Sequence, residues 1–154
     1  MDNSNPDADY SHFFRDEEFR SKYPDLKMPP PSFTSSSAKI LSFAAGRSIT
    51  LAFPVREDQT NPLGTLQGGI LASFFDDAFG TLAFASLKKP CVTIDIMVNF
   101  IRPMNTGESV VIRAEFKSRT RKLLWLSAEA FNNKEKLIAT ATSNLMVIDN
   151  KEPS

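Results

Sequence analysis

Apolar and polar residues alternate in six segments of the chain, and this period of two is typical of strands that bury one face. The first two segments, residues 40–45 and 49–55, are separated by Gly46 and predict a hairpin. The other four lie nearer the C-terminus and are joined by polar turns; they cover residues 92–100, 110–116, 124–130 and 137–147. The pattern therefore predicts two strands before the middle of the chain and four after it.

Residues 68–87, between the second and third predicted strands, have a helical pattern instead. Apolar residues cover most of the circumference of this helix, which predicts burial on nearly all sides; they are Ile70, Leu71, Phe74, Phe75, Ala78, Phe79, Leu82 and Ala83. Its polar or small positions form one narrow stripe, at Ser73, Asp76, Asp77 and Gly80. We therefore expect an α+β fold in which a curved antiparallel sheet of about six strands wraps round one long central helix.

The first 37 residues differ in composition from the remainder, so we divide the chain into an N-terminal extension and a folded domain at residues 38–150. The extension has a polar start that we expect to be disordered, a short predicted helix and an extended Pro/Ser linker, at residues 1–9, 10–23 and 24–37. Three phenylalanines of the predicted helix point inward in this interpretation, which favours docking of the extension; they are Phe13, Phe14 and Phe19.

Composition excludes several classes of protein. The 154 residues include 18 basic and 18 acidic side chains without a basic run, so nucleic acid is not an expected partner. No uncharged apolar stretch reaches the roughly 20 residues of a membrane helix, and the acidic N-terminus does not resemble a signal peptide. We therefore expect a cytoplasmic protein that does not interact with membranes.

The chain has one cysteine, Cys91, and one histidine, His12. A single cysteine excludes an internal disulfide and a cysteine-based metal site, and His12 is far in sequence from every other candidate residue. A Ser/His/Asp triad and a multi-histidine metal centre are thus not expected. Carboxylates, amides, hydroxyls and backbone groups must carry any chemistry, with no metal.

Two features of the predicted helix are candidates for that chemistry. Asp76 and Asp77 are adjacent carboxylates, and no Lys or Arg occurs between Arg56 and Lys88 to neutralise them. They face solvent or serve a site, and burial of the rest of the helix favours a site. Gln67-Gly68-Gly69 begins the helix, where backbone amides lack acceptors and glycines allow a ligand to approach.

These residues, with their spacing, resemble a known family. Asn61, five residues, Gln67-Gly68-Gly69, six residues and Asp76 resemble the signature of the hotdog-fold thioesterases, in the branch of the phenylacetate-degradation thioesterase. Residues 93–96 and 99–103 are similar to the third strand of the family and its end, and the resemblance covers about residues 38 to 148. It implies a hotdog fold and hydrolysis of an acyl-CoA thioester to a carboxylic acid and coenzyme A, with no cofactor apart from the coenzyme A of the substrate.

The resemblance also implies roles for single residues. The Gly68 amide would polarise the thioester carbonyl, Asp76 would act as general base or nucleophile, and Thr93 would lie near that carboxylate. The family has a histidine where this chain has Gln67, which cannot take up a proton near neutral pH. A non-catalytic protein that binds acyl-CoA or another apolar ligand is therefore the alternative, and a hotdog dehydratase is disfavoured because no core histidine exists.

Supporting roles are expected for further residues. Asn61 either orients Gln67 or holds the attacking water, or it is a turn residue before Pro62. We assign Gly69 and Asp77 to substrate binding. Four basic residues either grip the phosphates of coenzyme A, which suit arginine geometry, or are ordinary turn charges; they are Arg102, Arg119, Arg121 and Lys122.

The spacing of the two main candidates implies a second subunit. Gly68 and Asp76 are eight residues apart, which is about 12 Å along a helix axis, so they cannot both touch one carbonyl group. Two copies with antiparallel helices would bring Gly68 of one copy to Asp76 of the other and form two equivalent sites. Gly80 would permit close approach of the helices. We expect a homo-oligomer, either a dimer or a tetramer.

Overall fold

A computed structural model describes residues 9–148 of the chain. Its elements, in chain order, are η1 (Tyr10–Arg15), α1 (Glu17–Lys22), α2 (Pro31–Ser35), β1 (Lys39–Ala44), β2 (Ser48–Pro54), η2 (Glu57–Gln59), α3 (Gly68–Leu87), β3 (Cys91–Phe100), β4 (Ser109–Arg119), β5 (Leu123–Phe131) and β6 (Leu137–Val147). The six predicted strands and the long predicted helix are confirmed.

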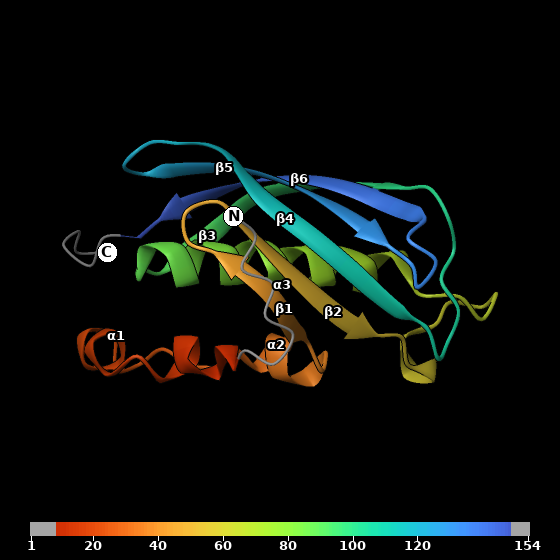
Figure 1. The fold of residues 1–154 in the computed structure, drawn as a ribbon, viewed down its shortest axis with the longest axis horizontal. Coiled ribbons are helices and arrows are strands. Elements are labelled where there is room, and N and C mark those ends of the chain that lie inside the picture. The colour runs from red at the N-terminus through yellow and green to blue at the C-terminus, as the bar shows by residue number, and fades with distance from the viewer. Residues whose placement is uncertain (1–8, 149–154) are drawn as a thin grey trace.

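The strands form one antiparallel sheet in the order β1-β2-β4-β5-β6-β3. The chain crosses from β2 through α3 to the opposite edge, so β3 pairs only with β6 and is an edge strand. The sheet curves round α3, which lies along its concave face (Figure 1). The predicted architecture of a curved sheet around a central helix is therefore confirmed.

Aromatic and aliphatic side chains fill the space between helix and sheet. Alternate residues of β2 are buried, and the Phe53 ring stacks on the Phe74 ring of α3 with centroids 4.4 Å apart. Helix α3 has the length and apolar composition of a membrane-spanning helix, but these are also properties of a core helix. Its buried positions here pack inside the sheet, and the helix ends where Lys88 adopts a left-handed conformation, φ 52°.

We call residues 9–37 the N-terminal arm; of the start predicted to be disordered, residues 1–9, all but Asp9 lies outside the described residues. The helix predicted over residues 10–23 is two short helices, η1 and α1, because Asp16 ends the first and caps the second by accepting a hydrogen bond from Phe19 N (2.9 Å). The three phenylalanines are buried as predicted.

The prediction of an extended linker over residues 24–37 is wrong in its second half. Pro31 occupies the first position of α2, where proline favours helix formation, and Phe33 of α2 is buried. The arm lies against α3 on the side away from the sheet (Figure 1). Its aromatic side chains belong to the same hydrophobic core as those of the sheet, so the arm is a third layer of the fold.

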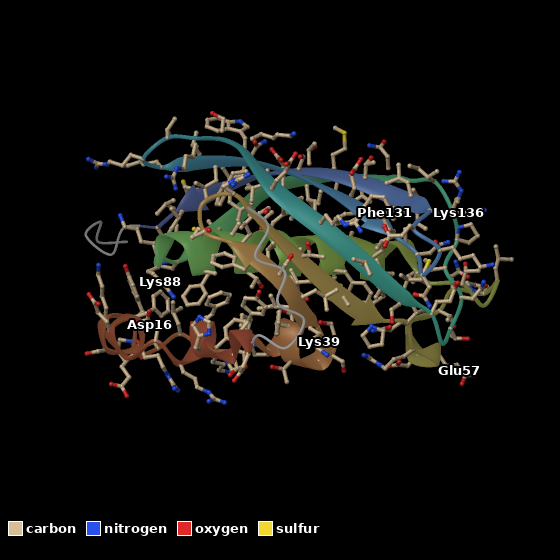
Figure 2. The ribbon with its side chains drawn as sticks, viewed as in Figure 1. Asp16, Lys39, Glu57, Lys88, Phe131 and Lys136 are labelled. Carbon is tan, nitrogen blue, oxygen red and sulfur yellow. The ribbon has the colours of Figure 1, made fainter. Side chains whose placement is uncertain are left out.

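The contacts that hold this layer at the C-terminal end of α3 include a ring pair and an ion pair. The Phe19 ring packs edge-on against Phe84 with centroids 4.6 Å apart. The carboxylate of Asp16 faces the ammonium group of Lys88 at 3.2 Å (Figure 2). Since the ion pair is partly exposed, most of the stabilisation comes from burial of the aromatic rings.

Candidate active site

One face of α3 is covered neither by the sheet nor by the arm. Its exposed residues are Gly69, Ser73 and Asp76, at spacings of four and three, and Gly80 continues the same stripe half-buried. The polar stripe predicted from the sequence is therefore the open face of the helix, except that Asp77 lies off it.

A hydroxyl group from the neighbouring edge strand holds the carboxylate of Asp76. Thr93 Oγ1 donates a hydrogen bond to Asp76 Oδ1 at 2.6 Å. Thr93 lies just before a β-bulge in the pairing of β3 with β6, between Thr93 and Asp95. A hydrogen bond to a charged acceptor is strong and orients the carboxylate, so Asp76 can act as a base in a defined direction.

Replacing Thr93 by Val tests this contact. Loss of the hydroxyl leaves Asp76 without its orienting hydrogen bond, so kcat for thioester hydrolysis is expected to fall by about tenfold, the size of a hydrogen bond to a charged group. Thr93→Ser keeps the hydroxyl and should retain most of the activity. Equal activity of the Val and Ser variants, measured by thiol release, would show that the hydroxyl is not needed.

The other main candidate lies at the start of α3. Gln67 is the N-cap residue but its side chain makes no capping hydrogen bond, and its carbonyl accepts from Ile70 N (3.0 Å) and Leu71 N (3.1 Å). The Gly68 and Gly69 amides belong to the first helical turn, where N–H groups have no acceptor within the helix. They can donate to a developing negative charge, aided by the helix dipole.

Asp77, which the sequence analysis assigns to substrate binding, lies against the N-terminal arm. Ser32 Oγ donates to Asp77 Oδ1 at 2.7 Å, and Ser36 Oγ lies 3.4 Å from Oδ2. Both serines belong to the arm, so the Asp77 carboxylate is directed away from the open face. Burial raises its pKa above the ordinary 3.8, the nearby Asp76 charge adds to this, and the serine hydrogen bonds oppose it.

Asp77→Asn is expected to stabilise the protein at neutral pH. A carboxyl group with a raised pKa in the folded state binds a proton more readily when folded, so the free energy of unfolding falls as pH rises above 3.8. Asparagine carries no charge and removes this cost. The variant should melt at a higher temperature than wild type at pH 7, and the difference should shrink towards pH 3.5. A difference that is independent of pH would contradict this assignment.

The side chain of Asn61 forms hydrogen bonds within its own loop. Its side chain donates to Thr65 Oγ1 (2.9 Å) and accepts from Leu63 N (3.0 Å) and Thr65 N (3.2 Å). These contacts support the interpretation of Asn61 as a turn residue. Gln67, which Asn61 was expected to orient, is instead held through its backbone, with Gln67 N donating to Gln59 O at 2.9 Å.

The four basic residues proposed to bind phosphate do not form one group within the chain. Arg102 follows β3 at the Gly68 end of α3 and donates a hydrogen bond to Leu137 O. The turn with Arg119, Arg121 and Lys122 lies at the opposite end, where Val147 N donates to Lys122 O at 2.8 Å and Val147 pairs with Cys91. The ten residues of β3, about 30 Å, separate the two locations.

Sequence reasoning missed the serines that hold Asp77. Ser32 and Ser36 lie in the segment that we interpreted as a linker, and only the packing of α2 on α3 brings them to the carboxylate. No periodic pattern marked them. Among residues 9–148, no group of three His, Cys, Asp or Glu side chains is placed to hold a metal ion.

The fold and the site together define a protein of the hotdog type, with a carboxylate on the open face of its central helix and glycine amides in the first turn of that helix. A model of the thioesterase superfamily matches residues 63–139, half of the chain. The chain belongs to the thioesterase superfamily, and its reaction class is thioester hydrolysis. The resemblance inferred from the motifs is confirmed.

Individual relatives agree with this assignment. The mouse protein acyl-coenzyme A thioesterase 13 is 32% identical over 113 residues, which are 71% of this chain and 80% of the mouse protein. A crystal structure of a phenylacetic acid degradation-related protein from Ralstonia eutropha, described as a putative thioesterase, is 28% identical with a TM-score of 0.73, covering 84% of this chain and 98% of that one.

A further solved structure shares the fold at lower identity. It is a protein from the phenylacetic acid degradation operon of E. coli, with 18% identity and a TM-score of 0.75, covering 92% of this chain and 97% of that one. At this identity the similarity shows that the two proteins have the same fold.

Proposed function

We propose that the protein is an acyl-CoA thioesterase whose active site is shared between two subunits. The observation that carries the proposal is the Thr93–Asp76 hydrogen bond on the open face of α3, eight residues from the free amide of Gly68. The mouse relative supports acyl-CoA as the substrate. The reaction uses water and groups of the chain, so it needs no resident metal or cofactor.

The exposed edge of the sheet supports the second subunit. β3 is an edge strand, and large apolar side chains on it or next to it are exposed, namely Val92, Ile94, Met97, Phe100 and Ile101. Unpaired backbone groups beside exposed apolar side chains favour association with another chain. An antiparallel pairing of two copies along this edge would also bring the open faces of the two α3 helices together.

In the proposed reaction, a water molecule attacks the thioester carbon while Asp76 of one subunit accepts its proton. The carbonyl oxygen becomes an oxyanion that accepts a hydrogen bond from Gly68 N–H of the other subunit. The carbon–sulfur bond then breaks, the proton passes to the leaving thiolate, and the products are a carboxylic acid and coenzyme A. Direct attack by Asp76 on the carbonyl is the alternative route for the same residue.

Gln67 keeps a binding protein as the second candidate, because the family signature that these motifs resemble has a histidine at the position of Gln67, and glutamine cannot take up a proton near neutral pH. A thiol-release assay with short, medium, long and aryl acyl-CoAs separates the two. We expect release from wild type with no inflection near pH 6.5, the imidazole reference pKa, and only a modest change in kcat for Gln67→His. Saturable acyl-CoA binding without thiol release, together with activity gained in Gln67→His, would instead establish the binding protein.

A further inference from the structure

An aromatic ring lies directly against the proposed oxyanion donor. Phe100 is the last residue of β3, and a Cβ atom built on Gly68 would lie 3.2 Å from its Cζ and 3.5 Å from Cε1 and Cε2. The end of the ring thus abuts the first turn of α3, and a side chain at position 68 would require the ring to shift. The close packing accounts for glycine there independently of ligand access.

Phe100 is not a core residue, although it is large and apolar. Its side chain is 58% exposed and that of the next residue, Ile101, is 47% exposed. Exposed aromatic surface beside a free helix amide is the arrangement of a ligand site with an apolar wall and a polar anchor. Phe100 and Gly68 belong to the same chain, so the contact between them is present in each subunit.

The position of the Phe100 ring beside Gly68 restricts which acyl groups can bind with their carbonyl at the Gly68 amide. A carbonyl oxygen that accepts a hydrogen bond from Gly68 N–H lies about 2.9 Å from the nitrogen, and its carbon is about one bond length further. The carbons attached to that carbonyl are then within a few ångströms of Gly68, the residue against which the end of the Phe100 ring lies. An apolar acyl chain would cover the ring, whereas a charged acyl group would be desolvated against it.

We propose that Phe100 determines acyl specificity: its ring forms the apolar wall beside the Gly68 amide and selects alkyl or aryl acyl groups over short or charged ones. The proposal rests on the proposed thioesterase function and adds the substrate class of the same site. Phe100 contacts the substrate without taking part in proton transfer.

The first test is Phe100→Ala, with kcat/KM measured for octanoyl-CoA and acetyl-CoA. The loss of ring contact should lower kcat/KM for octanoyl-CoA by about tenfold and that for acetyl-CoA by less than about twofold. Trp125→Ala is the matched control, because Trp125 is a large aromatic side chain of β5, 37% exposed, which pairs with Asn144 of β6 and does not lie on the β3 edge. It should leave the octanoyl preference unchanged, with both variants checked for wild-type oligomeric state.

The second test uses the contact itself. Gly68→Ala keeps the amide N–H but places a Cβ 3.2 Å from Phe100 Cζ, so we expect it to shift the ring and to lower kcat/KM for octanoyl-CoA by about tenfold. In the Phe100→Ala background the same substitution should cost less than about threefold, since the ring is gone. Equal losses in both backgrounds would show that the two residues act independently and would overturn the proposal.

Binding separates failure of this inference from failure of the proposed function. S-octyl-CoA is a thioether that cannot be hydrolysed, and free coenzyme A lacks the alkyl chain. Calorimetry should show about tenfold weaker binding of S-octyl-CoA to Phe100→Ala than to wild type, with equal binding of coenzyme A. If wild type releases no thiol yet this difference in binding is found, Phe100 forms the apolar wall of a binding site, and the proposed thioesterase activity is wrong. If Phe100→Ala releases thiol with the acyl preference and the binding of wild type, the thioesterase function is supported and the proposed role of Phe100 is wrong.

Discussion

Asp76→Asn is expected to lower kcat by about 10² to 10⁴, the usual loss when a general base is removed. Asparagine has nearly the same shape as aspartate. Its side-chain oxygen can still accept the hydrogen bond that Thr93 Oγ1 donates to Asp76 Oδ1 in wild type, at 2.6 Å. It cannot accept a proton from water. The measurement is thiol release under saturating acyl-CoA, with the fold of the variant checked by circular dichroism and its melting temperature.

Asp77→Asn is the matched control for this prediction. It makes the same chemical change at the next position of α3, but Asp77 is directed at Ser32 and Ser36 of the arm. We expect it to change kcat by less than about threefold. Asp77 points about 100° away from Asp76 around the helix axis, so the substitution does not alter the face that carries Asp76. If Asp77→Asn were the inactive variant, the assignment of the base would be wrong by one residue.

Mixing two inactive variants is expected to restore activity if the site is shared. Gly68→Pro removes the amide N–H, and proline is accepted there because it is the first helical position and Gln67 before it is extended, φ −63° and ψ 133°. Equal amounts of Gly68→Pro and Asp76→Asn should form heterodimers as half of the dimers. One of the two sites in each heterodimer has both groups, so about a quarter of wild-type activity is expected.

Two controls make the mixing experiment decisive. Gly68→Ala introduces a Cβ against Phe100 as proline does but keeps the amide N–H, so it controls for the effect of the Cβ alone. Different affinity tags on the two chains show that subunits have exchanged. Heterodimers that contain both variants but have no more activity than either parent would rule out a site shared in this way.

The strands and the central helix could be predicted because each buries a regular set of positions. The alternation of Ile49, Leu51 and Phe53 requires a strand with one buried face, and residues 68–87 bury most of their circumference only as a helix inside a sheet. The strand order could not be predicted in this way, because the residue pattern of β3 does not indicate that it pairs with β6 and not with β2. Pairing depends on the crossover of the chain through α3.

The arm shows where pattern reasoning fails. Its phenylalanines predicted docking, which is confirmed, but the proline and serine residues at 24–37 are also typical of turns and linkers, so the composition did not predict α2. Whether α2 forms depends on burial of Phe33 against the rest of the core, a contact distant in sequence. Local propensity is too weak for a helix of five residues, so tertiary packing decides.

Within the site, the sequence by itself determined the carboxylate, the glycine pair and their separation of eight residues along one helix, because helix geometry follows from the chain alone. Tertiary structure decided which of two adjacent carboxylates is open. Packing of the arm takes Asp77 to Ser32, and the position of β3 brings Thr93 to Asp76 and Phe100 to Gly68. Neighbours along a helix differ by about 100° in direction, so the elements that cover each face determine which side chain meets the substrate.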